Sequence, residues 1–184
     1  IDTRFHRSVI GKIGYMAAYL EPSNKPPIAI SYFSPSQSSR YKAYDRLKPL
    51  DEQEPYFYLT RRKFEHQEHG ISNLVCIGGP ESDLEDGMTY DAVGHDYPIE
   101  AQDEITCFMR KTFRTFPLGE TRYVFTWHGL MGYTRTGVRC IGPDPDYPVL
   151  LYNLGCNGVG ILSSIYGGKR ISNFLKHDRL EPSV

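Results

Sequence analysis

Val149-Leu-Leu-Tyr-Asn-Leu-Gly-Cys-Asn-Gly-Val-Gly-Ile-Leu162 runs from an apolar strand through a glycine-rich turn into the start of a helix. Gly155, Gly158 and Gly160 let the backbone approach a ligand closely, and the first N–H groups of a helix carry partial positive charge. Their order, G-x-x-G-x-G, is the reverse of the dinucleotide fingerprint G-x-G-x-x-G, which occurs nowhere in the chain. The turn therefore indicates either ligand contact or tight packing of helix on sheet, and it is not a pyrophosphate site.

The surrounding sequence predicts short strands and two helices. Ile99, Ile105, Phe108, Met109 and Phe113 recur at helical intervals among charged residues, which predicts an amphipathic helix after Pro98. A closing helix is expected over residues 160–175. The predicted strands are Val9 to Leu20 paired with Ile28 to Phe33, a hairpin of residues 55–60 and 73–78, and residues 122–127, 138–141 and 149–154.

These elements predict an α+β fold with a mixed, largely antiparallel sheet and flanking helices, in which residues 73–78 form a central strand. Residues 34–55 carry Ser, Pro and alternating charges, which suggests a surface excursion with at most one short helix around residues 41–47. The chain shows no internal repeat.

Composition excludes several functions. The 184 residues are 40% hydrophobic, which is enough for a globular core, and their formal net charge is −1. A chain this close to neutrality lacks the basic surface that binds nucleic acid or an anionic membrane. Its apolar runs fall short of the roughly 20 residues that a membrane-spanning helix needs. We therefore expect neither a nucleic-acid partner nor a membrane.

The cysteines indicate the compartment. Cys76, Cys107, Cys140 and Cys156 are widely spaced and form no C-x-x-C pair, so we expect free thiols and a cytoplasmic protein. The chain begins at Ile1 without a signal peptide, which makes it plausible as part of a longer protein.

The segment before the glycine turn carries a second pattern, Trp127-His-Gly-Leu-Met-Gly-Tyr-Thr-Arg-Thr-Gly-Val-Arg-Cys-Ile-Gly-Pro143. Together the two segments resemble the C-terminal region of the D-amino-acid oxidase-like family, which includes glycine and sarcosine oxidases. That family has the form G-L-x-x-x-T-x-D-G-x-P-x-I-G, followed by a strand, a glycine turn and a long helix. Gly129, Leu130, Thr134, Gly137, Ile141 and Gly142 match, whereas Thr136 replaces the usual Asp and Arg139 the usual Pro. The resemblance covers roughly residues 55 to 176.

The resemblance implies the C-terminal part of an FAD-dependent oxidoreductase that acts on an amine or amino-acid-like substrate by hydride transfer to the flavin. Residues 1–148 would then be a substrate-binding domain, and residues 149–184 a strand and helix that return to the FAD domain. An N-terminal Rossmann segment of the same protein would be the partner that binds the dinucleotide. The chain alone, lacking that segment, is expected to hold no FAD and to be inactive. The implied flavin contacts are Gly155, Asn157, Gly158, Val159, Gly160 and Ile161.

The resemblance also implies a substrate pocket, to which we assign Trp127, Met131, Tyr133 and Arg135. At Met131 glycine oxidases carry an arginine that binds the substrate carboxylate, and monomeric sarcosine oxidases carry a cysteine bonded to the flavin. Met131 provides neither group, and either lines an apolar pocket or fills space. No protein nucleophile is required, because the cofactor supplies the chemistry.

Two other features have structural explanations. Glu65-His-Gln-Glu-His69 lies in a polar hairpin loop with no third ligand, so we expect no metal site. Cys156 has no base beside it and is interpreted as a packing residue. The alternative to an enzyme is a non-catalytic binding or interaction domain with the same fold; the sequence identifies neither the substrate, nor the electron acceptor, nor the oligomeric state.

Overall fold

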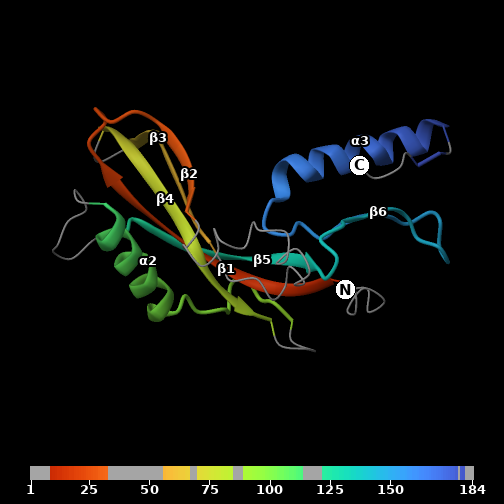
Figure 1. Ribbon diagram of the computed structural model, residues 1–184, viewed down its shortest axis with the longest axis horizontal. Helices are drawn as coiled ribbons and strands as arrows, with labels where there is room; N and C mark the ends of the chain where they lie inside the picture. Colours follow the sequence, from red (N-terminus) through yellow and green to blue (C-terminus); the bar gives the residue numbers. More distant parts are fainter. Residues whose placement is uncertain are drawn as a thin grey trace, which may run out of the picture. The chain divides into compact units, whose positions relative to one another are not determined.

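A computed structural model describes residues 9–32, 56–66, 70–84, 89–113, 122–177 and 179–180 (Figure 1). The described residues fall into two compact units. Residues 13–32, 56–66, 70–84, 89–113 and 122–130 form the sheet unit, and residues 9–12, 131–177 and 179–180 form the C-terminal unit. The predicted α+β class is confirmed. The predicted domain division at residue 149 concerns a longer protein and stays a prediction.

The sheet has five strands in the order β2-β3-β4-β1-β5. Strand β4 therefore lies at the centre, as the sequence predicted. The strands span Val9–Glu21 (β1), Ile28–Tyr32 (β2), Phe57–His66 (β3), Gly70–Asp83 (β4) and Phe125–Thr134 (β5). The predicted hairpin is confirmed as the antiparallel pair β3 and β4, and its strands are longer than predicted because the polar residues after Thr60 continue the ladder as far as His66 opposite Gly70.

The predicted pairing of the first two strands is wrong. Strand β2 pairs with β3, from Ile28 opposite Arg61 to Tyr32 opposite Phe57, while β1 lies between β4 and β5. The connection between β1 and β2 does not form a hairpin turn, since the two strands are not neighbours in the sheet. Side chains of β3 and β4 bind its carbonyl groups instead. Asn73 donates to the carbonyls of Pro22 and Lys25 at 3.1 and 3.0 Å, and Lys63 donates to the carbonyl of Ser23. These contacts direct the chain across the ends of β4 and β3 to the far edge.

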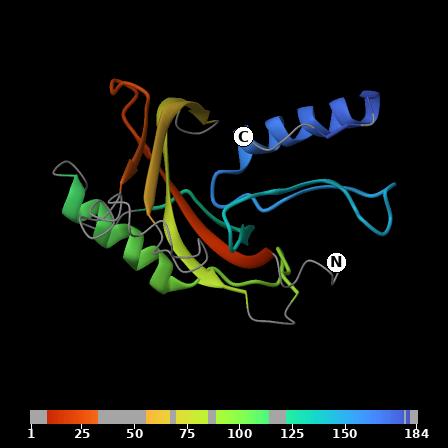
Figure 2. The same ribbon diagram turned by 45° about the vertical axis from the view of Figure 1, so that its right-hand side comes forward.

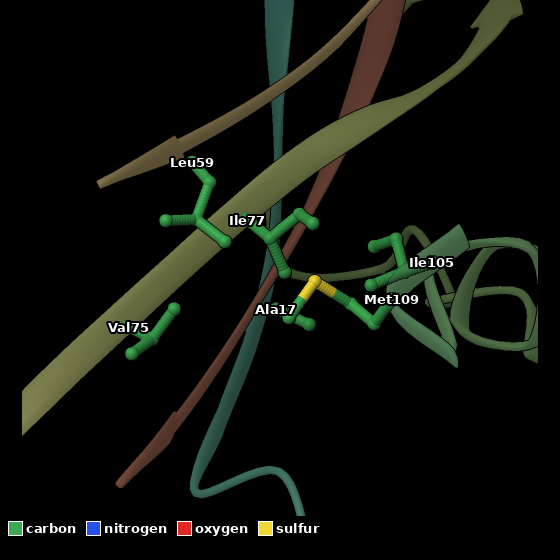
Figure 3. Close-up of a cluster of buried hydrophobic side chains, with 6 residues drawn as sticks. All are labelled: Ala17, Leu59, Val75, Ile77, Ile105 and Met109. Atoms are coloured by element: carbon green, nitrogen blue, oxygen red, sulfur yellow. The ribbon is translucent and has the colours of Figure 1, made fainter. Parts of the chain in front are cut away.

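Helix α2, Ile99–Thr112, covers one face of the sheet (Figures 1 and 2). Its buried residues recur every four positions, at Ala101, Ile105 and Met109, so they form a single stripe. Figure 3 shows the core that this stripe completes, which consists of Ala17 from β1, Leu59 from β3, Val75 and Ile77 from β4, and Ile105 and Met109 from α2. The predicted amphipathic helix is thus confirmed.

Side chains on the opposite face of the same strands form a second apolar cluster. Ala18, Leu74 and Cys76 are buried there, each next in sequence to a residue of the first core, as the two-residue period of a strand requires. Tyr58 lies on this face beside Gly78, where an added Cβ would come within 2.6 Å of the tyrosine ring. Burial, followed by the nearby charge of Glu81, raises the pKa of Tyr58 to about 12.

The C-terminal unit contains a two-stranded antiparallel sheet of β6, Cys140–Pro143, and β7, Leu151–Leu154. Helix α3, Gly160–His177, packs against both strands. Gly167 permits this approach, because a Cβ there would lie 2.4 Å from the side-chain oxygen of Asn153. The predicted strand, turn and helix are therefore present, and their return to a flavin domain stays a prediction.

We predict that Met109→Ala lowers the free energy of unfolding of the sheet unit by about 2–5 kcal/mol, because a fully buried side chain leaves a cavity. Urea unfolding followed by the fluorescence of Trp127, the single tryptophan of the chain, measures the change. Cys107→Ala, at an exposed position of the same helix, is the control and should change stability by less than about 0.5 kcal/mol. Equal effects of the two substitutions would contradict the assigned core.

Candidate functional site

The turn between β7 and α3 is held in a left-handed backbone conformation. Gly155, Asn157 and Gly158 have φ angles of +82°, +51° and +75°. A side chain is excluded at two of these positions by neighbours as well as by the backbone. An added Cβ would lie 2.5 Å from the Thr134 methyl group at Gly155 and 2.8 Å from the Tyr133 hydroxyl at Gly158. The internal packing of the unit thus accounts for both glycines.

Gly160 differs from the other two glycines of the turn. It begins α3 with an ordinary helical conformation, and an added Cβ would meet only the Cβ of Cys156, at 3.4 Å. In a helix interior alanine is more stable than glycine by about 0.8–1 kcal/mol, and at the first helical position this preference is smaller. The packing of the described residues therefore does not explain why a glycine stands here.

Asn157 ties the turn to the end of β5. Its side-chain oxygen accepts hydrogen bonds from the backbone N–H of Thr134 at 2.7 Å and from the Thr134 hydroxyl at 3.2 Å. Its side-chain NH₂ donates to the carbonyl of Gly137 at 3.0 Å, and its backbone N–H donates to the carbonyl of Gly132 at 2.9 Å. Four hydrogen bonds from one residue thus fix the turn, whereas the sequence analysis predicted only a flavin contact for Asn157.

The N-terminus of α3 has no side-chain cap from the turn. Position 159, which precedes the helix, is a valine and offers no oxygen to the first N–H groups of the helix. The N–H of Val159 itself donates to the carbonyl of Cys156 at 3.0 Å and closes the turn. The first helical N–H groups are consequently available to a polar or anionic ligand.

Apolar side chains surround this helix start. Val159, Ile161, Leu162 and Ile165 are between 61% and 79% exposed. Gly158 is also exposed. Of the predicted flavin contacts, Gly158, Val159 and Ile161 thus lie at the surface of the unit and Gly160 is half-buried. Gly155 is buried, and the side-chain amide of Asn157 is used to hold the turn.

The predicted pocket residues come from β5 and the turn after it. Met131 and Tyr133 are two residues apart on β5 and so share one face of that strand. Tyr133 is buried and packs against Gly158, which joins it to the glycine turn. Arg135 is exposed in the turn that follows. Trp127 is exposed on the part of β5 that belongs to the sheet unit.

His128 and its neighbours form a hydrogen-bonded network in the sheet unit. Its Nδ1 faces the Tyr90 hydroxyl at 2.8 Å, and its Nε2 faces the carbonyl oxygen of His95 at 2.9 Å. His95 in turn meets the Tyr15 hydroxyl at 2.9 Å, and Tyr15 also bonds Ser82. Because both ring nitrogens of His128 have partners, this histidine anchors the loop before α2 to the sheet and is no candidate for binding substrate.

The fold and the turn define a domain of the α+β class in which a helix N-terminus lies beside exposed glycine and apolar residues. The chain belongs to the family described as FAD dependent oxidoreductase, which it matches over residues 21–173. The match confirms the family resemblance drawn from the sequence and extends it toward the N-terminus. No curated protein matches the chain.

Two solved structures share the fold. One is fructosyl amine: oxygen oxidoreductase, Amadoriase I, from Aspergillus fumigatus, with a TM-score of 0.54, and the other is a double-cysteine mutant of that enzyme, with a TM-score of 0.51. Each is 16% identical and covers 96% of this chain, whereas the chain covers 37% of each structure. The chain therefore spans little more than a third of these proteins.

The described residues contain neither a candidate metal site nor a helix that could cross a membrane. No three His, Cys, Asp or Glu residues come together there in an arrangement that could hold a metal ion. Most of the segment from Glu65 to His69 lies outside the described residues. Neither described helix combines the length and apolar composition that crossing a membrane requires. The four cysteines are free thiols, as predicted.

We predict that Asn157→Ala destabilises the turn by about 4–5 kcal/mol, because it removes three side-chain hydrogen bonds of about 1 kcal/mol each and forces alanine into a left-handed conformation at about 1–2 kcal/mol. Asn157→Gly loses the same bonds without the conformational cost and should destabilise it by about 1–2 kcal/mol less. Hydrogen exchange of the amides at positions 163 and 164, the first in α3 with helical acceptors, measures both effects. Ser172→Ala, exposed on the same helix, is the control. Equal destabilisation by the two Asn157 substitutions would contradict the conformational cost assigned to alanine at this position.

Proposed function

We propose that this chain forms the substrate-binding side of a longer FAD-dependent oxidoreductase, which oxidises an amine or amino-acid-like substrate by hydride transfer to the flavin. Family membership supports the cofactor. The name of the structural neighbour, a fructosyl amine oxidoreductase, supports the amine class of substrate. The chain's span of 37% of that neighbour supports a longer whole protein. In this proposal the chain alone holds no FAD.

Gly160 is the observation that carries the cofactor assignment. Its neighbours leave room for a methyl group, and its backbone conformation is one in which alanine is favoured. A glycine at such a position is explained if a ligand approaches the backbone closely where α3 begins. The three surface positions around it, Gly158, Val159 and Ile161, would then contact the flavin, while Gly155 and Asn157 shape the turn.

The residues at the start of α3 fit the pyrimidine edge of a flavin. When bound, the oxidised flavin would supply the redox chemistry by accepting the hydride, and its reduced form would carry negative charge at this edge. The first N–H groups of α3 favour an anion by roughly 0.3–1 kcal/mol, and by up to about 2 kcal/mol where the site is partly buried. The chain's contribution is thus to orient the ring and to stabilise charge through backbone groups.

The exposed apolar face of α3 supports a Rossmann segment of the same protein as the partner. Ile161, Leu162 and Ile165 are each at least two-thirds exposed, an unusual density for one side of a helix. Covering this face would bury apolar surface and would also remove water from the helix start. The predicted assignment of residues 149–184 to the FAD side agrees with this arrangement.

The substrate pocket we propose is formed by Trp127, Met131, Tyr133 and Arg135. Three of these four side chains carry no charge, so β5 itself supplies no carboxylate-binding cation. Arg135, which follows the strand, is the one positively charged residue of the four. The pocket therefore favours a substrate recognised by apolar and aromatic contact more than by a carboxylate.

We predict that Gly160→Ala weakens FAD retention in the full-length protein at least about fivefold, because its methyl group meets the cofactor and not the protein. Gly168→Ala is the matched control, since Gly168 also lies in α3 and an added Cβ there meets nothing within 4 Å. Both alanines should stabilise the helix by up to about 1 kcal/mol. FAD affinity by fluorescence titration and thermal unfolding separate the two effects.

The Gly160 comparison also decides between an enzyme and a binding domain. If the full-length protein holds FAD and Gly160→Ala retains it as well as Gly168→Ala does, the glycine turn is not the cofactor contact. If the full-length protein holds no FAD at all, the non-catalytic alternative is supported and the proposed function fails.

We predict that Met131→Arg shifts the specificity of the full-length enzyme toward substrates that carry a carboxylate. A guanidinium at this position can form paired hydrogen bonds with a carboxylate, which the thioether cannot. The ratio of kcat/KM for an amino acid to that for the corresponding amine should rise at least about tenfold. An unchanged ratio would place Met131 away from the substrate, and Met131→Leu, which conserves the volume, is the control.

A further inference from the structure

Arg139 links three elements of the C-terminal unit. It directly precedes β6, and its guanidinium donates to Ser163 of α3 at 2.7 Å, to Ser164 of α3 at 3.0 Å and to the side-chain oxygen of Asn153 of β7 at 2.9 Å. Asn153 completes the group by donating to the carbonyl of Ser164 at 3.0 Å. The planar fork of an arginine thus holds the first two turns of the helix against the small sheet.

Ser163 connects the guanidinium of Arg139 to the first residues of α3 through hydrogen bonds. Because its hydroxyl oxygen accepts a hydrogen bond from Arg139, its proton is left to donate to the carbonyl of Val159 at 2.5 Å or of Gly160 at 3.3 Å. The arginine is therefore connected through one side chain to the two residues at which the helix begins. Those residues belong to the proposed flavin contact.

The charge of Arg139 has no counter-ion among the described residues. All three of its acceptors are uncharged, and its Nε is buried without a protein partner. A cation near the N-terminus of a helix opposes the positive end of the helix dipole, so this placement costs stability in the absence of an anion. The same placement strengthens the positive potential that an anion at the start of α3 would experience.

We propose that Arg139 is a positioning residue for the flavin site, which fixes the N-terminal turn of α3 and adds positive charge that favours the reduced, anionic cofactor. This inference rests on the proposed function, because it requires that a flavin meets α3. The arginine acts through Ser163 and through its field, and it does not touch the cofactor. Its removal should loosen the helix start and make the flavin harder to reduce.

The test combines a measurement on this chain alone with one on the full-length protein. In the 184-residue chain, Arg139→Gln, Arg139→Lys and Ser163→Ala should each speed hydrogen exchange by about tenfold at positions 163 and 164, the first amides of α3 with helical acceptors, because each substitution breaks side-chain hydrogen bonds to that turn. Lys169→Gln, which removes an exposed charge from the middle of α3, should leave that exchange unchanged. Unchanged exchange in all three variants would overturn the positioning role.

In the full-length protein, Arg139→Gln should lower the preference for reduced over oxidised flavin by about fivefold, which corresponds to about 20 mV for a two-electron couple. Arg139→Lys and Ser163→Ala keep the charge and should retain most of the potential, as should Lys169→Gln. A potential unchanged in Arg139→Gln, with FAD still bound, would overturn the electrostatic role and leave the proposed function intact. A full-length protein without FAD would instead overturn the proposed function, while the exchange result on the chain would still decide the positioning role.

Discussion

The hydrogen bonds of Asn157 are the interaction on which the candidate site depends. A turn with three residues at positive φ in four positions has no regular backbone ladder to stabilise it. The side-chain amide replaces that ladder by pairing with the N–H of Thr134 and the carbonyl of Gly137. Since Thr134 ends β5, the turn is held by a strand, and the start of α3 takes its position from the turn. Rigid support of this kind is what a site built from backbone groups requires.

The sequence predicted the type of most elements because their periodicity is local. The four-residue spacing of Ala101, Ile105 and Met109 and the β-branched residues of β4 are visible without any tertiary contact. The order of the strands is not visible in this way. Strand β1 could pair with β2 on local grounds, and the outcome depends on Asn73 and Lys63, which bind the connecting segment from 51 and 40 residues further along the chain.

Much of the candidate site could likewise be predicted from spacing, and the rest could not. The glycines and their place between strand and helix are explicit in the sequence. Which glycines are required by packing, and which position has space for a methyl group, depends on the tertiary contacts of Thr134 and Tyr133. The role of Asn157 had a local signal, since asparagine followed by glycine is a frequent left-handed turn pair. The role of Arg139 had none, because its acceptors lie 14 to 25 residues further along the chain.

The C-terminal unit combines two features that are unfavourable in isolation. The start of α3 places exposed apolar side chains beside N–H groups without a side-chain cap, and an arginine without a counter-ion adds to the positive end of the helix dipole. Each feature lowers the stability of the unit in water. Both features become favourable if a planar group with an apolar body and a negatively charged edge is enclosed there. The exposed apolar side chains then contact its body. The N–H groups of the helix and the charge of the arginine then stabilise its edge. A domain with no such ligand would gain stability from a serine at position 159 and an alanine at position 160, so the valine and the glycine present there agree with the proposed flavin contact.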